Sequence, residues 1–142
     1  MMKTIVVKIG GEVVGSGEAA LLGQDLRELS ADHRIAIVHG GGPQATELQK
    51  KLGLTTTQIA GRRVTDAATL DVMKMVIAGK LNVDLCAALL AAGLSPVGLH
   101  GASGHVVKAT RRPPKPCPPA APEPVDPGFV GERFRFHGYG FT

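Results

Sequence analysis

Two glycine turns, each placed directly after an apolar run, constrain this chain more than any other feature. The first is Val6-Val7-Lys8-Ile9-Gly10-Gly11 and the second is Ile37-Val38-His39-Gly40-Gly41-Gly42. Glycine leaves room for an oxyanion to approach main-chain N–H groups, which such turns can point into a common concavity. Two turns of this kind on neighbouring strands predict an anion-binding cleft at the carboxyl edge of a sheet.

The spacing of apolar residues predicts strands and helices in alternation. The expected strands are 4–9, 34–38, 94–99 and 105–110, and the expected helices are 18–29, 43–52 and 67–92. The continuous apolar run 4–9 is typical of a strand buried on both faces of a parallel sheet. Asp66 is a natural N-cap for the longest helix, and Gly93 can end it with a left-handed cap. We therefore expect the α/β class, with an open, mostly parallel sheet and helices on both faces.

The composition changes abruptly near residue 112. Eight of the ten prolines lie between Pro113 and Pro127, and all five aromatic residues follow them. The segment 112–127 is therefore predicted as an extended, polyproline-like connector. We expect 1–111 to be one folded lobe and 128–142 an atypical aromatic and basic segment. That segment could be a short strand, a partner-binding tag or an altered chain end.

The charge is distributed unevenly, and this argues against nucleic acid binding. The net charge is +4, and residues 108–142 hold six Lys and Arg against three Asp and Glu. A nucleic-acid-binding protein usually carries its basic residues on folded elements with aromatic residues among them. No apolar run is long enough to cross a membrane, and no leader-like segment opens the chain. We therefore expect a cytoplasmic protein, with no membrane partner and no metal site built by Cys and His.

Lys8 and Arg63 are the candidate charged ligands. An ammonium group in a buried strand must meet an anion or reach water, and the glycine pair after Lys8 favours the anion. There Lys8 would neutralise charge on a transferring phosphoryl group. The pair Arg62-Arg63 could clamp a substrate carboxylate or could simply be solvated, and the residues alone leave this open. His39 is expected to order its turn by hydrogen bonding and is given no catalytic role.

Four motifs in order resemble the amino acid kinase superfamily and, within it, the N-acetylglutamate kinases. The motifs are Lys8-Ile9-Gly10-Gly11, His39-Gly40-Gly41-Gly42-Pro43-Gln44, Gly61-Arg62-Arg63-Val64-Thr65-Asp66 and Gly79-Lys80-Leu81-Asn82. They cover about residues 3–111. The later segment Val125-Asp126-Pro127-Gly128-Phe129-Val130-Gly131-Glu132 is also similar, with Pro127 in place of a leucine. The resemblance implies ATP-dependent phosphorylation, with Mg²⁺, of the side-chain carboxylate of N-acetyl-L-glutamate, a step of arginine biosynthesis.

The resemblance also implies a role for individual residues. Lys8 would stabilise the transferring phosphoryl group as the catalytic residue. Gly10 and Gly11 would cradle phosphate oxygens, while Gly41 and Gly42 would hold the reacting groups from the other side. Arg63, rather than Arg62, matches the position that binds the α-carboxylate. The helix 67–92 resembles one through which these kinases form homodimers.

The sequence also departs from the family. Members run to about twice this length, and their C-terminal lobe, which binds the nucleotide, has no counterpart here. Past Glu132 the resemblance is expected to end, as in a truncated or frame-altered product. The main expectation is therefore the N-terminal, substrate-binding lobe of an acetylglutamate kinase, with impaired activity. A non-catalytic module that binds an acidic metabolite or a partner, and a related aminoadipate-type kinase, are the alternatives.

Overall fold

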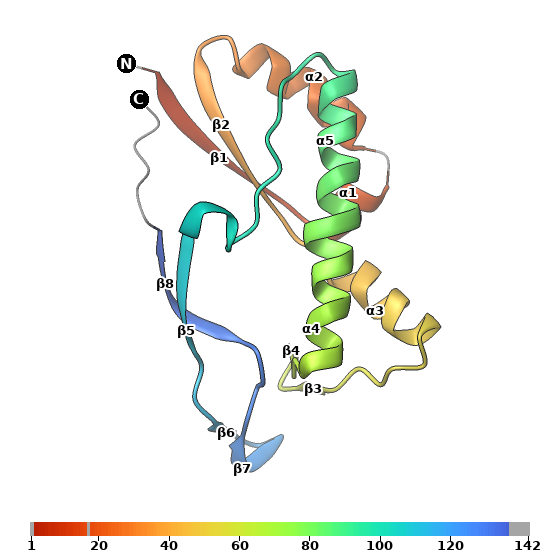
Figure 1. Cartoon of the computed structure of the whole chain (residues 1–142), viewed down its shortest axis with the longest axis vertical. Helices are drawn as coiled ribbons and strands as arrows, with labels where there is room; N and C mark the ends of the chain where they lie inside the picture. Colours follow the sequence, from red (N-terminus) through yellow and green to blue (C-terminus); the bar gives the residue numbers. More distant parts are fainter. Residues whose placement is uncertain (1, 17, 137–142) are drawn as a thin grey trace. The chain divides into compact units, whose positions relative to one another are not determined.

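The computed structural model describes residues 2–16 and 18–136 and divides into two compact units (Figure 1). Unit 1 comprises the chain up to Leu48 together with Lys74–Gly98. Unit 2 comprises Gln49–Met73 together with the chain after Gly98. Both glycine turns belong to unit 1, and Arg63 belongs to unit 2.

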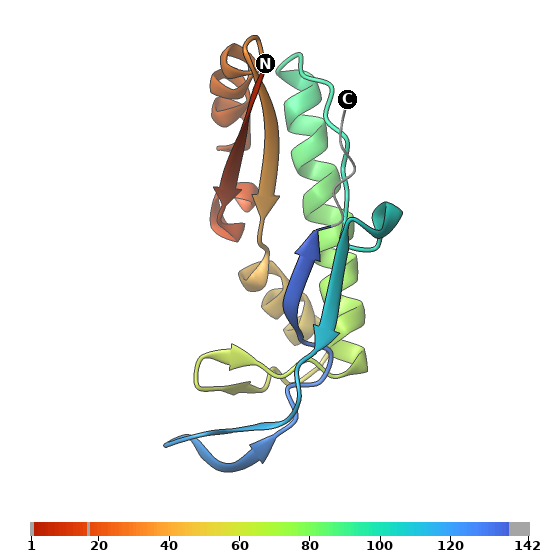
Figure 2. The ribbon, with the colours of Figure 1, turned by 90° about the vertical axis from the view of Figure 1, so that its left-hand side faces the viewer.

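Unit 1 is built around two parallel strands, β1 (Lys3–Ile9) and β2 (His33–His39), which lie side by side in Figures 1 and 2. Their register pairs Lys3 with His33 and Ile9 with His39, so both strands end at the same level. The predicted strands and their parallel direction are confirmed. Burial on both faces is not, because one face is open, with Val6 67% and Val38 55% exposed.

Three helices accompany the two strands of unit 1, and the last of them continues into unit 2. α1 (Gly11–Gly15) begins directly after β1, α2 (Ala19–Leu29) leads into β2, and α3 (Gly42–Lys51) begins after β2. The predicted start of α3 at the turn before Pro43 is confirmed. The predicted end is slightly too late, since the helix stops at Lys51 and Leu52 is exposed. The core of this unit includes Ile9, Val14, Leu26, Ala45, Val76, Leu81, Leu85 and Leu89.

The two glycine turns touch through their backbones. A Cβ placed on Gly11 would lie 2.9 Å from both Cα and N of Gly41, closer than real Cβ contacts come. A Cβ on Gly41 would in turn meet the side chains of Leu81 and Ile77. The Gly40 N–H donates to the Ile9 carbonyl at 3.2 Å, and this bond joins the ends of the two strands. These turns contain glycine because a side chain at either contact position would push them apart.

The predicted helix 67–92 is present as three consecutive helical segments. They are α4 (Ala67–Met73), a π-helical segment η1 (Lys74–Leu81) and α5 (Asn82–Ala91). The buried residues are spaced by three, four, five, four and four positions: Thr69, Val72, Val76, Leu81, Leu85 and Leu89. The step of five coincides with η1, where wider turns take up one extra residue. The expectation that this helix mediates homodimerisation stays a prediction.

Unit 2 consists mainly of antiparallel strand pairs. β3 (Gln58–Ile59) pairs with β4 (Arg62–Arg63), and the turn between them places Ala60 at φ 49° and Gly61 at φ 72°. β5 (Val107–Arg111) pairs with β8 (Gly131–Phe136), as Figure 2 shows. β6 (Lys115–Cys117) pairs with β7 (Ala121–Val125), and a short 3₁₀ turn, η2 (Ser103–His105), precedes β5.

Three local predictions require correction. The segment 94–99 forms no strand, although it was expected to be the third core strand. The strand predicted at 105–110 begins two residues later and is antiparallel. The proline-rich segment 112–127 is no polyproline connector, because it contains the β6–β7 hairpin. Two-stranded ribbons have outward-facing N–H positions at which proline loses no ladder bond. The sequence-predicted domain boundaries themselves stay a prediction.

The expectations for the two ends of the long helix are confirmed. The Asp66 carboxylate accepts a 2.8 Å bond from the Thr69 N–H, as an N-cap residue does. Gly93 has a φ of 83° and follows α5 directly. Of the three interpretations offered for the segment 128–142, the short strand is present as β8. Residues 137–142 lie outside the described part of the chain. Within 2–16 and 18–136, no helix is both long and apolar enough to cross a membrane.

The contact between the glycine turns predicts a sharp difference between neighbouring glycines. Replacing Gly11 by alanine should destabilise the chain by about 1–3 kcal/mol, because the new methyl group meets the Gly41 backbone. Gly10→Ala is the matched control. Nothing lies within 4 Å of its added Cβ, and its φ of −67° suits alanine. That control should be neutral or stabilising by up to about 1 kcal/mol in denaturant unfolding. Equal losses for both variants would contradict the contact.

The helix cap at Asp66 predicts a pH-dependent stability. The bond from the Thr69 N–H, and then that from its hydroxyl, lowers the pKa of Asp66 below its ordinary value. A carboxyl whose pKa is lower in the folded state stabilises the fold at neutral pH and loses this effect as acid protonates it. Asp66→Ala should therefore lower the melting temperature at pH 7, and this difference from the wild type should shrink as the pH falls below the ordinary Asp value and the carboxylate is protonated.

The control for this comparison is Asp25→Ala, which removes an exposed aspartate of α2. Its melting temperature should follow that of the wild type at every pH. A difference between wild type and Asp66→Ala that keeps its size down to about pH 2 would show that the ionised carboxylate does not account for the stabilisation.

Candidate functional site

Lys8 lies one residue before the end of β1, on the exposed face of the two-stranded sheet. It is exposed and pairs in register with Val38. Because side chains alternate along a strand, it shares its face with Val6, and Ile9 is buried on the other face. Of the two alternatives that the sequence left for this ammonium group, Lys8 reaches water in the described structure. Its contact with an anion stays a prediction.

The predicted cradle residues of unit 1 come together at one point. Gly10 precedes α1 and Gly11 begins it, while Gly41 precedes α3 and Gly42 begins it. The first N–H groups of a helix have no partner within that helix, and such groups are the ones that bind anions in many proteins. Because Gly11 and Gly41 touch, two helix starts lie side by side. The structure thus brings Gly10, Gly11, Gly41 and Gly42 into one cluster.

Two side chains of the second motif order this cluster. Gln44 Nε2 donates a 2.6 Å hydrogen bond to the Gly11 carbonyl, which ties α3 to the first turn. His39 Nδ1 donates to the Gly40 carbonyl at 3.2 Å. The expectation that His39 orders its turn is therefore supported by its geometry. The sequence did not predict this role of Gln44 in joining the two turns, although Gln44 lies within the second glycine motif.

Arg63 lies in unit 2, on the two-residue strand β4. Its neighbour Arg62 is exposed, whereas Arg63 is half-buried, because successive residues of a strand face opposite sides. Arg63 Nη1 donates to Gln49 Oε1. Gln49 also accepts a 3.2 Å bond from Thr56 Oγ1 and donates a 3.0 Å bond to Thr69 Oγ1. The choice of Arg63 over Arg62 thus coincides with a difference in their surroundings.

The segment after Arg63 is held by the loop between β7 and β8. The Thr65 N–H donates to the Pro127 carbonyl at 2.9 Å, and the Phe129 N–H donates to the Thr65 carbonyl at 2.7 Å. Gly128 lies between these two bonds with a φ of 77°, where an added Cβ would meet the Thr65 carbonyl. This contact links the late sequence motif to the arginine motif within unit 2.

Arg111 and Asp126 hold the same loop through further contacts. Arg111 donates to Asp126 Oδ2 at 2.8 Å and to the Gly128 carbonyl at 3.1 Å, and it lies over the Phe129 ring. The Gly128 N–H donates to Asp126 at 2.8 Å and is the main reason that the pKa of Asp126 is lowered; Arg111 lowers it further. Asp126 therefore acts as a loop-forming residue in this geometry.

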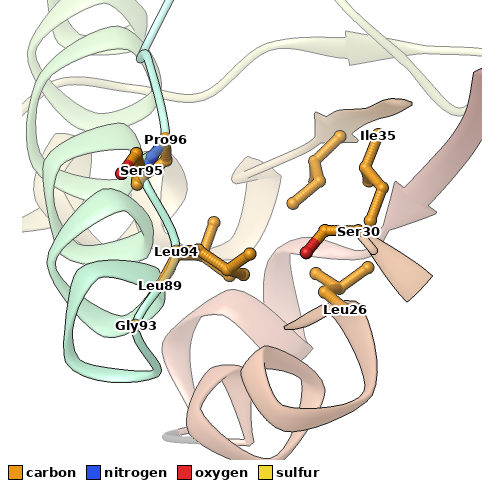
Figure 3. Close-up of a pocket in the computed structure, with 9 residues that line it drawn as sticks. Leu26, Ser30, Ile35, Leu89, Gly93, Leu94, Ser95 and Pro96 are labelled. Atoms are coloured by element: carbon orange, nitrogen blue, oxygen red, sulfur yellow. The ribbon is translucent and has the colours of Figure 1, made fainter. Parts of the chain in front are cut away.

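A pocket of about 380 Å³ lies elsewhere in unit 1 and contains none of the predicted site residues (Figure 3). Its lining is mostly apolar and comes from α2, β2, α5 and the segment after α5: Leu26, Ser30, Ile35, Ile37, Leu89, Gly93, Leu94, Ser95 and Pro96. A lining with two hydroxyl side chains and no charged group does not suit a phosphoryl group or a carboxylate. The candidate anion site is therefore the glycine cluster.

Sequence reasoning also missed Gln49, for which a signal existed. Gln49 follows Ala45 by four residues on α3, and both are fully buried. Positions i and i+4 share a helix face, so a polar residue there stands on the apolar stripe. Such a residue must find hydrogen-bond partners, but the sequence does not reveal which ones.

Comparisons with known proteins agree with the motifs and extend them. The sequence profile of the amino acid kinase family matches residues 3–137. Acetylglutamate kinase from Anaeromyxobacter dehalogenans (strain 2CP-C) is 65% identical over 137 residues, which is 96% of this chain and 51% of that protein. Acetylglutamate kinase from Sorangium cellulosum (strain So ce56) is 62% identical over 129 residues, covering 90% of this chain and 45% of the relative.

A solved structure shares the fold. N-acetylglutamate synthase from Neisseria gonorrhoeae, complexed with coenzyme A and N-acetyl-glutamate, aligns with a TM-score of 0.66 at 22% identity. The alignment covers 92% of this chain and 28% of the synthase. At this identity the likeness concerns the fold alone.

The extent of these matches changes one expectation from the sequence and adds a fact about the length of the chain. The family match runs past Glu132, so the expected end of the resemblance there is wrong, and the proline-rich segment lies within the match. The chain spans about half the length of the curated relatives it matches. Since the family profile covers nearly all of the chain, this protein belongs to the amino acid kinase family.

Proposed function

We propose that this chain is the N-terminal, substrate-binding lobe of an acetylglutamate kinase and binds N-acetyl-L-glutamate. The observation that carries the proposal is the backbone contact between Gly11 and Gly41. It gathers two helix starts beside the end of the strand that carries Lys8, in a chain 65% identical to an acetylglutamate kinase. An anionic substrate suits this arrangement of amides and one cation.

The proposed reaction transfers the γ-phosphoryl group of ATP to the side-chain carboxylate of N-acetylglutamate. A carboxylate oxygen forms a bond to the γ-phosphorus, while the bond from that phosphorus to the β,γ-bridging oxygen breaks. The products are an acyl phosphate and ADP. Negative charge spreads over the oxygens of the transferring group, so positioned donors and cations lower the barrier.

Each site residue has one role in this proposal. Lys8 neutralises charge on the transferring phosphoryl group. Gly10 and Gly11 direct amides toward phosphate oxygens, and Gly41 and Gly42 do so toward the reacting carboxylate and phosphoryl group. Gln44 keeps the two turns in contact through its bond to the Gly11 carbonyl. Arg63 binds the α-carboxylate through its guanidinium, which suits carboxylates geometrically.

ATP with Mg²⁺ is the proposed phosphoryl donor. The residues of the glycine cluster fit the phosphate groups, since they supply amide N–H donors and an ammonium group. Among residues 2–16 and 18–136, no group of three or more His, Cys, Asp and Glu could hold a metal ion. Mg²⁺ bound to the nucleotide would neutralise phosphate charge. Arginine biosynthesis is the proposed pathway, by analogy with the named relatives.

A non-catalytic, metabolite-binding role is the second candidate function. The observation that favours it is that the amides of the glycine cluster can hold anionic groups whether or not a phosphoryl group is transferred. The two candidates agree on N-acetylglutamate binding and differ on turnover.

The reaction is tested by trapping the acyl phosphate with hydroxylamine in the presence of ATP, Mg²⁺ and N-acetylglutamate. If the chain is catalytic, it should form hydroxamate, and Lys8→Ala should lower the rate about 10²–10³-fold, because a charge-stabilising group is lost. Lys3→Ala is the matched control, since it removes an exposed lysine at the other end of the same strand. It should leave the rate within about twofold.

Calorimetry with N-acetylglutamate separates the remaining outcomes. Binding without hydroxamate would contradict the kinase and favour the metabolite-binding module. Neither binding nor hydroxamate would overturn both candidates. Equal losses in Lys8→Ala and Lys3→Ala would overturn the role of Lys8.

A further inference from the structure

Gln49 is an uncharged polar side chain at the centre of a buried hydrogen-bond network in unit 2. It is 0% exposed, and nothing in the family motifs includes it. Its amide makes three bonds: it donates to Thr69 Oγ1, and it accepts from Thr56 Oγ1 and from Arg63 Nη1. A buried amide that satisfies its partners in this way adopts one orientation, because each alternative leaves a polar atom unpaired.

This network fixes the oxygen of Gln49 toward Arg63. Because a guanidinium can only donate, the amide oxygen Oε1 must face Arg63, and the amide nitrogen then donates to Thr69 Oγ1 at 3.0 Å. Thr69 is itself buried, and its N–H is bound by the Asp66 carboxylate. The acceptor that meets Arg63 is thus attached to the start of α4. A guanidinium carries five N–H donors, and the one at Nη1 meets Gln49.

We infer that Gln49 is a positioning residue for Arg63. It holds the guanidinium in one orientation before a ligand arrives, so that a carboxylate meets an ordered donor pair. An arginine without such a partner would lose rotamer freedom on binding, and that loss weakens affinity. The inference rests on the proposed function, in which Arg63 binds the α-carboxylate of N-acetylglutamate. Gln49 acts through Arg63 and is not a catalytic residue.

The neighbouring Arg62 provides an internal reference. It stands on the same two-residue strand but faces the other side and is exposed. If the network orders Arg63, then rotation of its guanidinium about the Nε–Cζ bond should be slower than that of Arg62. Arginine side-chain ¹⁵N exchange spectra of the wild-type chain measure both rates without a ligand. We expect a difference of about tenfold, the size of one hydrogen bond to a charged group. Equal rates would overturn the inference, and this test needs no variant.

Two substitutions then assign the order to Gln49. Gln49→Met keeps the length of the side chain but removes the acceptor, so Arg63 rotation should accelerate about tenfold. Gln49→Glu keeps oxygen acceptors in place, so rotation should stay slow. If Gln49 had only a structural role, slow rotation of Arg63 would not depend on the acceptor. It would then not be slow in Gln49→Glu and fast in Gln49→Met. Unchanged rotation in Gln49→Met would contradict the inference.

The effect on binding is measured with two ligands by calorimetry or NMR titration. N-acetylglutamate carries the α-carboxylate, whereas 4-acetamidobutyrate has the same amide and side-chain carboxylate without it. Gln49→Met should weaken N-acetylglutamate about three- to tenfold and leave 4-acetamidobutyrate unchanged. In an Arg63→Ala background, Gln49→Met should have no further effect on N-acetylglutamate. Equal weakening of both ligands would mean a general structural role and would overturn the inference.

Failure of the proposed function gives a different pattern. If the wild type bound neither ligand while Arg63 rotated slowly in a Gln49-dependent manner, the ordering of Arg63 would hold and its assignment to N-acetylglutamate would fail. If the wild type bound N-acetylglutamate and Arg63→Ala weakened it while Gln49→Met did not, the proposed function would stand and the positioning role would fail.

Discussion

The close backbone approach of Gly11 and Gly41 is the constraint on which the candidate site depends. It follows from the in-register pairing of β1 with β2, because strands that end at the same level deliver their turns to the same place. The approach requires two residues without side chains, and the Gly40 and Gln44 hydrogen bonds then hold the turns together. As a consequence, the backbone amides of the glycine cluster (Gly10, Gly11, Gly41 and Gly42) lie beside the end of β1, the strand that carries Lys8.

In unit 2 the main constraint is different, because Arg63 lies on β4, a strand of only two residues. A strand this short has little pairing of its own, so its position depends on what surrounds it. Gln49 binds the Arg63 side chain, and the Gly128 loop binds the backbone at Thr65 through two hydrogen bonds. The late motif around Asp126 and Gly128 is thereby explained as a support for the arginine motif.

The glycine turns and the helix caps could be predicted from the sequence, because one local physical effect determines each of these residues. Glycines after apolar strands, an aspartate before a helix and a glycine after it act locally, so Asp66 and Gly93 were predictable. The segment 94–99 was not, because an apolar run becomes a strand only when a neighbouring edge pairs with it. The proline-rich hairpin was missed for the related reason that proline content does not show which N–H positions face outward.

The residues of the candidate site also fall into two groups, those that the sequence predicts and those that it does not. The glycines and Lys8 could be chosen from spacing and chemistry, whereas the preference for Arg63 over Arg62 needed the family resemblance. The partners of Gln49 could not be inferred, because they come from Thr56, Arg63 and Thr69 and depend on tertiary packing. The extra residue taken up by the π-helical segment η1 was likewise invisible to a search for a regular helical period.

The central claim is that the glycine cluster binds the anionic groups of N-acetylglutamate and a phosphoryl donor. Backbone amide NMR during titration with N-acetylglutamate, and then with inorganic phosphate, tests it most directly. The account predicts that the amide resonances of Gly11, Gly41 and Gly42 shift saturably, while those of the loop glycines Gly53 and Gly104 stay in place. Saturable shifts confined to other residues, or none at the glycine cluster, would contradict it.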